Sequence, residues 1–227
     1  MARAESSWAV RATFCEAGFG ECAYIMSVVI AFENYRKRRM SPPLVLVDMF
    51  QSELELVAPG ISPRTIPALA NCYWLLKCAR SRNWPVAFVR PAPSLDPDEA
   101  QPSQWIEGFG PQPEDMIFDR CGTSCYDSMD FAEMIDEIGG IFVLAGFGSE
   151  STGLFTLIDA SRRNHCAGLV CDASASRPLT GFNAADSHRA VVAIADRYGS
   201  IVTAEHWAAV ASTTRTISEA TYVNSGP

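Results

Sequence analysis

Four residues in this sequence have the chemistry of a catalytic site, and each follows a short apolar run. They are Asp48, the neighbouring Asp119 and Arg120, and Thr152. A carboxylate can act as a general acid or base, a guanidinium can stabilise negative charge, and a hydroxyl can attack as a nucleophile. We predict these four as the catalytic residues. The structural alternative is that an Asp or Thr at such a position only caps a helix.

The stretch 141–176 is the best candidate for the centre of the site. Its apolar run at 141–145 is typical of a buried strand, and the following Gly-Phe-Gly permits a sharp turn. Ser149 is a candidate N-cap of the next helix, so Thr152 would lie in the first turn of that helix. Backbone N–H groups at a helix start favour negative charge. The substrate-binding residues predicted in this turn are Phe147, Gly148 and Ser149.

Strand and helix patterns alternate along most of the chain. Apolar runs predict six strands, at 44–47, 85–89, 115–118, 141–145, 168–171 and 201–203. Helical spacing predicts helices at about 63–82, 131–138, 152–164 and 184–198. The alternation predicts an α/β fold, a three-layer αβα sandwich with a six-stranded parallel sheet. Since the carboxyl ends of parallel strands share one edge, the candidate catalytic residues are expected to meet there.

The stretch 90–113 is rich in proline and polar residues and is predicted to be an active-site loop or lid. Its apolar residues Trp105, Ile106 and Phe109 either close over a small ligand or anchor the loop on the core. We predict Trp105 and Phe50 as substrate-binding aromatic residues.

The first 42 residues are predicted to be an N-terminal helical extension, followed by a domain over 43–227. Apolar residues at helical spacing in this extension precede a basic run at 36–39. Three interpretations stay open: a helix packed on its own domain, a subunit-contact arm, or a patch for nucleic acid or an anionic surface.

Composition argues against several classes of protein. The 227 residues are 48 % hydrophobic and 19 % charged, as in a soluble globular domain, and the net charge of −8 disfavours nucleic acid as the main partner. No apolar run reaches the roughly 20 residues of a membrane span. The eight cysteines form no C-x-x-C pair and the three histidines are scattered, so we expect reduced thiols, no metal, no cofactor and a cytoplasmic location.

Several segments, in order, resemble the isochorismatase-like cysteine hydrolase superfamily over about residues 43–209. LVLVDMFQSEL is similar to its opening strand, VLAGFGSESTGLFTLIDA to its nucleophile segment, and GLVCDASAS to the next strand and loop. Asp186-Ser187-His188 and IVTAEHW are similar to its last helix and strand. The resemblance implies the superfamily's parallel-sheet fold, commonly a homo-oligomer, and an Asp–Lys–Cys catalytic triad.

The triad implied by the resemblance is incomplete in this sequence. Asp48 falls on the triad aspartate, but Thr152 stands at the cysteine position and Asp119 at the lysine position, with Arg120 adjacent. Phe147–Gly148 falls where relatives have a cis peptide, and the metal-binding histidines of nicotinamidases have no counterpart at 90–93. If Asp48 and Asp119 lie close together, the pKa of one of them is raised, which suits acid catalysis.

Two functions follow from these departures. The first is a hydrolase of a small organic substrate that breaks an amide C–N or enol-ether bond through Asp48 without a cysteine nucleophile. The alternative is a catalytically inactive member that serves as a ligand-binding or assembly partner. An enzyme requires Asp48 within hydrogen-bond reach of Thr152 or of the substrate, whereas an inactive member would have a filled pocket or structural partners on Asp48.

Overall fold

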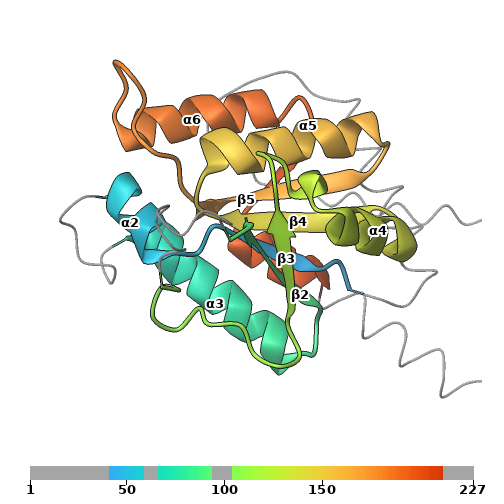
Figure 1. The fold of residues 1–227 in the computed structure, drawn as a ribbon. Helices are drawn as coiled ribbons and strands as arrows, with labels where there is room; N and C mark the ends of the chain where they lie inside the picture. Colours follow the sequence, from blue (N-terminus) through green and yellow to red (C-terminus); the bar gives the residue numbers. More distant parts are fainter. Residues whose placement is uncertain (1–40, 59–65, 94–103, 212–227) are drawn as a thin grey trace, which may run out of the picture.

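The computed structural model describes residues 41–58, 66–93 and 104–211. Its centre is one sheet of six parallel strands in the order β3-β2-β1-β4-β5-β6 (Figure 1). The strands are β1 (Leu44–Val47), β2 (Val86–Pro91), β3 (Met116–Arg120), β4 (Ile141–Gly146), β5 (Cys166–Ser174) and β6 (Ser200–Val202). The predicted α/β class and the six-stranded parallel sheet are confirmed.

Helices cover both faces of the sheet (Figure 1). One face carries α2 (Gln51–Val57), α3 (Pro67–Ser81) and the helical residues 204–211. The other carries α4 (Met129–Ile138), α5 (Leu154–Arg162) and α6 (Ala184–Ala195). Two short turns complete the described chain, the 3₁₀ turn η2 (Cys125–Asp127) and the π-helical turn η3 (Ser149–Gly153).

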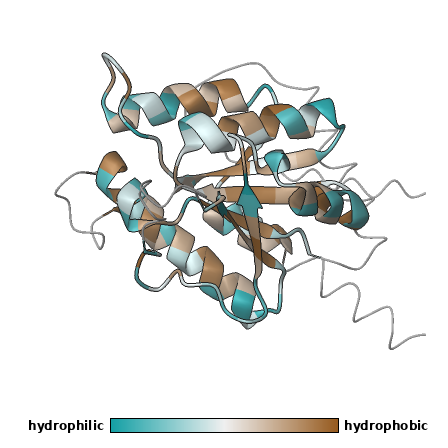
Figure 2. Cartoon of the chain, in the orientation of Figure 1, coloured by the Kyte–Doolittle hydropathy of each residue, from teal (hydrophilic) through white to brown (hydrophobic). Residues whose placement is uncertain are grey.

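The apolar run of β1 explains why the sheet has a core on each side. Leu44 and Leu46 pack in the cluster on the α3 side, whereas Val45 and Val47 pack in the cluster on the α4 and α5 side. Successive side chains of a strand point to opposite faces, so a strand buried on both faces is continuously apolar. In Figure 2 the central strands are accordingly brown, the colour of hydrophobic residues. The polar residues after these strands lie at one edge of the sheet.

Two local expectations are corrected by the structure. The stretch after β1, where no helix was among those predicted, forms α2, because Leu54 and Val57 are buried against the core and Glu53 lies in the first turn, where negative charge is favourable. Gly148 rather than Ser149 is the cap residue of η3, and it makes no side-chain cap bond.

Some predictions lie outside the described residues. They include the helical character of residues 1–40 and the part of the loop at 94–103. The domain boundary at 42 and 43 stays a prediction. No helix within 41–58, 66–93 or 104–211 has the length and apolar character needed to cross a bilayer.

Candidate active site

Asp48 lies at the carboxyl end of β1, in the middle of the sheet. Its backbone has φ +52, a left-handed conformation that Asp tolerates better than most residues, and its N–H donates to the Val89 carbonyl at 3.1 Å. The residue is only 4 % exposed. Uncommon backbone conformations that are held by surrounding contacts are concentrated at functional sites. Asp48 is therefore a fixed, buried carboxylate at the edge where ligands bind in parallel sheets.

Two residues from other elements donate hydrogen bonds to the Asp48 carboxylate. Nη2 of Arg120, at the end of β3, lies 3.0 Å from Oδ1 and 2.8 Å from Oδ2. Oγ1 of Thr152, in η3, donates to Oδ2 at 3.0 Å. The structure thus brings three of the four candidate catalytic residues together, from segments 72 and 104 residues away from Asp48 in the sequence.

Asp119 does not join this group, and the expected pair of carboxylates with Asp48 is corrected. Its Oδ1 accepts from Nε of Arg90 at 2.5 Å, and Arg90 is its neighbour in the β2–β3 ladder. Adjacent residues of a strand point to opposite faces, so Arg120 shares the inner face with Phe118 while Asp119 points the other way. The side chain of this strand that reaches Asp48 is Arg120.

Gly148 brings the backbone close to the Asp48 carboxylate. It has φ +69, and a Cβ at this position would lie 3.3 Å from Asp48 Oδ2 and 3.4 Å from Ser151 Oγ. A side chain would therefore be both strained and crowded. The peptide bonds of the described residues are trans, so the Phe147–Gly148 bond differs from the cis bond implied by the resemblance.

The side chains of Phe147 and Ser149 have structural contacts. Phe147 is 2 % exposed and belongs to the core on the α3 side. The N–H and Oγ of Ser149 both donate to the Ala175 carbonyl, at 3.1 and 3.0 Å, which ties η3 to the loop after β5. Both side chains are thus buried and occupied, and a role for Phe147 and Ser149 in binding substrate stays a prediction.

Phe50 and Trp105 contact each other. Their rings stack with centroids 4.4 Å apart, and Trp105 also meets the edge of Phe88 at 5.4 Å. The backbones of Phe50 and Trp105 form an isolated antiparallel bridge. The sequence left open whether Trp105 closes over a ligand or anchors the loop on the core, and these contacts are those of an anchor. A substrate role for the two rings stays a prediction.

The charge state of Asp48 reflects opposing influences. Burial raises the pKa of its carboxyl above the usual value, and the nearby Glu53 carboxylate adds to the rise. The Arg120 guanidinium and the Thr152 hydroxyl lower the pKa but do not cancel the effect of burial. A carboxyl with a raised pKa keeps its proton to higher pH, which suits a group that transfers protons.

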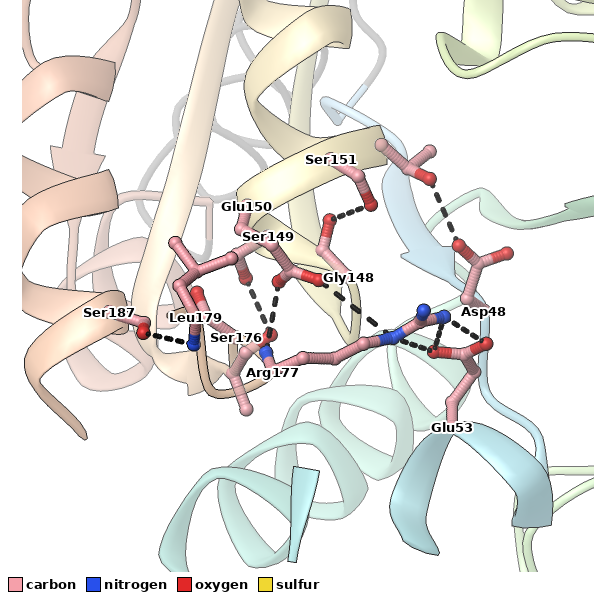
Figure 3. Close-up of polar contacts among 12 residues, drawn as sticks. Asp48, Glu53, Gly148, Ser149, Glu150, Ser151, Ser176, Arg177, Leu179 and Ser187 are labelled. Atoms are coloured by element: carbon pink, nitrogen blue, oxygen red, sulfur yellow. Dashed lines mark hydrogen bonds and ion pairs between the residues drawn. The ribbon is translucent and has the colours of Figure 1, made fainter. Parts of the chain in front are cut away.

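A second charged cluster beside Asp48 was not predicted from the sequence. Arg177, in the loop after β5, donates from Nε and Nη2 to the Glu53 carboxylate of α2 at 2.5–3.0 Å, and its backbone N–H donates to Glu150 Oε2 at 3.1 Å (Figure 3). Arg177 and Glu53 are 124 residues apart in the sequence, so no spacing rule could have paired them.

No group of three or more His, Cys, Asp and Glu side chains in the described part of the chain could hold a metal ion. The six cysteines of this part are free thiols. Burial raises the pKa of the Cys125 thiol to about 12, and the negative charge of Asp48 adds to the rise. The thiolate is the reactive form of cysteine, so Cys125 is not an activated nucleophile.

The sequence model of the isochorismatase domain matches residues 43–206. The chain belongs to the isochorismatase family. This match takes in all six strands and the three segments that hold Asp48, Arg120 and Thr152. No curated protein matches the chain.

Solved structures of isochorismatase-family proteins share the fold. An isochorismatase from Pseudomonas putida is 24 % identical, with a TM-score of 0.62, over 73 % of this chain and 89 % of that one. A hydrolase of the family from Chromobacterium violaceum is 21 % identical, with a TM-score of 0.65, over 76 % and 94 %. N-carbamoylsarcosine amidase from Thermoplasma acidophilum is 20 % identical, with a TM-score of 0.55, over 73 % and 97 %.

Proposed function

We propose that this isochorismatase-family protein is a hydrolase that breaks an amide C–N or enol-ether bond of a small organic molecule through Asp48, without a cysteine nucleophile. The observation that carries the proposal is the Asp48 carboxyl, which is buried and hydrogen-bonded to both Thr152 and Arg120. A positioned proton-transfer group with a hydroxyl and a cation each within hydrogen-bond distance of it is an arrangement that can support hydrolysis.

In this proposal Asp48 transfers the proton. Its raised pKa favours a protonated carboxyl that can give its proton to the double bond of an enol ether or to the leaving nitrogen of an amide. Water then adds at the activated carbon and returns a proton to Asp48. The adduct collapses with cleavage of the C–O bond of the enol ether or the C–N bond of the amide, which releases an alcohol or an amine. Arg120 stabilises the carboxylate that forms between these two steps, because its Nη2 already contacts both oxygens. Thr152 holds the carboxyl in place.

One observation favours the alternative of a catalytically inactive member. Both Asp48 oxygens already accept hydrogen bonds from side chains of the protein, and the residue is almost fully buried. An inactive member would keep this arrangement only to stabilise the fold.

Substitution of Asp48 separates the two functions. We expect Asp48→Asn to abolish hydrolysis in a panel of small amides and enol ethers, because the amide cannot exchange a proton with the substrate. Circular dichroism should show that the fold is retained. Asp159→Asn, which removes a partly exposed carboxylate on α5 that pairs with Arg162, is the matched control and should leave turnover unchanged. Equal turnover in Asp48→Asn and the wild type would remove Asp48 from the mechanism. No turnover of any panel member by the wild type would favour the inactive alternative.

A further inference from the structure

A small apolar cavity lies at the amino ends of the strands, on the edge of the sheet opposite Asp48. It has a volume of about 70 Å³ and is only partly enclosed. The first residues of β4, β5 and β6 line it, together with the helical residues 204–211. We call this surface the amino-edge groove, and its apolar lining includes Pro42, Ile141, Val143, Val202, Trp207 and Val210.

The described residues leave the amino-edge groove incompletely covered. Ile141 and Cys166 form a small apolar cluster apart from the two cores, and Val202 and Val210 are only half-buried. The Nε1–H group of Trp207 is buried and has no hydrogen-bond partner among the described residues. A buried indole N–H usually has an acceptor. These are the features of a surface on which a further apolar segment packs and to which it can supply a backbone carbonyl.

Both ends of the described chain lie at this groove. Pro42 lines it, and the next residue is fixed between β1 and β4 because the Val143 N–H donates to the Pro43 carbonyl at 3.1 Å. Residues 1–40 therefore join the described chain at the groove. At the other end Val210 lines the groove, one residue before the C-terminal segment 212–227 begins to lie outside the description.

The two segments outside the description differ in their apolar pattern. The N-terminal one has four apolar residues at the spacing of a single helix face, here called the apolar stripe: Ile25, Val28, Val29 and Phe32. The large apolar residues of 212–227 would be spread around a helix rather than gathered on one face: Ile217, Tyr222 and Val223. The N-terminal segment is thus the better match for an apolar groove.

The connection to the apolar stripe is long enough to reach the groove. Ten residues lead from Phe32 to Pro42, which span about 15 Å as a helix and up to about 33 Å when extended. The groove runs from β1 past β4 and β5 to β6, and three strand spacings amount to about 14 Å. The stripe is therefore within reach of the whole groove in either conformation.

We propose that the apolar stripe packs on the amino-edge groove of its own chain and places an apolar side chain in the cavity. Among the three interpretations of the N-terminal extension, this one is the helix packed on its own domain. The groove and Asp48 lie at opposite edges of the sheet, so the segment stabilises the domain without covering the candidate active site. The inference is independent of the activity proposed for Asp48.

Photo-crosslinking of the full-length protein tests the contact. The photoreactive residue p-benzoylphenylalanine replaces Phe32 in the stripe or, as the matched control, Asn34, which falls on the opposite side of the same helix. We expect about fivefold more crosslinking to residues 200–211 from position 32 than from position 34. Mixing ¹⁵N-labelled and unlabelled protein before irradiation identifies the chain that is reached. Crosslinked peptides of one isotope only are expected, because the contact lies within one chain.

Charge substitutions measure what the contact contributes to stability. Val28→Asp should lower the melting temperature of the full-length protein by about 4 °C, whereas Asn34→Asp adds the same charge on the other side and should leave it unchanged. Val210→Asp places the charge in the groove. Val28→Asp should have no further effect in the Val210→Asp background, because the contact is already lost there. If Val210→Asp does not fold, Val210→Ser takes its place in the double-mutant cycle.

Four results would overturn the inference. Position 32 could crosslink to another face of the domain, or the crosslinked peptides could carry mixed isotopes, which would make a second copy the occupant. The same photoreactive residue at Tyr222 could crosslink to the groove in place of position 32, which would make the C-terminal segment the occupant. Finally, an unchanged melting temperature in Val28→Asp would show that the stripe is not packed on the domain.

Discussion

The Asp48 carboxyl receives hydrogen bonds from two groups with different effects on its protonation. Arg120 brings a full positive charge and Thr152 a neutral hydroxyl, and both lower a pKa that burial raises. The balance among these effects decides the pH at which Asp48 holds its proton. Thr152 is the more instructive residue to change, because its removal leaves no buried charge unpaired.

Thr152→Val tests the role of this hydroxyl. The substitution keeps the shape but removes a hydrogen bond that lowers the pKa of Asp48, so that pKa should rise. If the protonated carboxyl is the active form, turnover falls as pH rises through the pKa, and the variant should move this fall to higher pH. The measurement is the pH profile of kcat, together with an NMR titration of the Asp48 carboxyl carbon. Thr152→Ser keeps the hydroxyl and should leave the profile in place. A shift towards lower pH would contradict the assignment.

At the scale of elements, the turn between β4 and η3 brings the backbone at Gly148 close to Asp48. Gly148 and Gly181 both have positive φ, at +69° and +83°, but only at Gly148 would an added Cβ have neighbours within 4 Å. Substituting each glycine in turn therefore separates the effect of backbone strain from the effect of contact with the Asp48 carboxylate.

Alanine at each glycine should cost about 1 kcal/mol of unfolding free energy, because a left-handed backbone disfavours Cβ. Only Gly148→Ala should also lower turnover and alter the Asp48 pKa, since its Cβ would press on the carboxylate. Urea unfolding and steady-state kinetics of the two variants are the measurements. Equal kinetics in Gly148→Ala and Gly181→Ala would show that a side chain at position 148 does not press on the reacting groups.

His165 lies between α4, α5 and η2, on the face of the sheet opposite α3. This histidine makes the stability of the fold depend on pH. Nδ1 of His165 lies 2.7 Å from the Tyr126 hydroxyl, and Nε2 lies 3.0 Å from Asp136 Oδ1. A neutral imidazole satisfies both contacts, by accepting from Tyr126 and donating to Asp136. Burial lowers the pKa of His165, and the attraction of Asp136 offsets this only in part.

Because the folded pKa of His165 lies below the unfolded value, protonation favours the unfolded chain. The contribution of this residue to stability is present above about pH 6.5 and is lost as pH falls through the folded pKa. His165→Gln should therefore make the melting temperature less dependent on pH between about 7.5 and 5. His206→Gln changes an exposed histidine and should leave the pH dependence as it is. A steeper dependence in His165→Gln would refute the predicted sign.

At the scale of the whole molecule, one sheet separates two apolar cores that share its strands. Phe88 is fully buried in the core on the α3 side and Phe142 in the core on the α4 and α5 side. Since β1, β2, β4 and β5 contribute residues to both cores, neither core can unfold alone without exposing the other.

Phe88→Ala and Phe142→Ala should each cost about 3–5 kcal/mol, from lost burial and an incompletely closed cavity. Each variant should still unfold in one transition, seen at the same urea concentration by tryptophan fluorescence and by far-UV circular dichroism. Two separate transitions in either variant would show that the faces of the sheet are independent. The implied homo-oligomer stays a prediction.

Local patterns were sufficient to predict the six strands, their parallel arrangement and the segments that carry Asp48, Arg120 and Thr152. Burial on both faces makes a strand continuously apolar, and this signal is contained in a few consecutive residues. The family could be identified because such segments occur in a characteristic order.

The tertiary structure decided which polar side chains meet. Asp119 and Arg120 are equivalent in spacing, and the face that β3 turns towards the core selects Arg120 as the partner of Asp48. The pairing of Arg177 with Glu53 and the stacking of Phe50 on Trp105 join distant segments. Such contacts depend on strand register and loop path, which are set by packing of the whole domain and leave no periodic trace in the sequence.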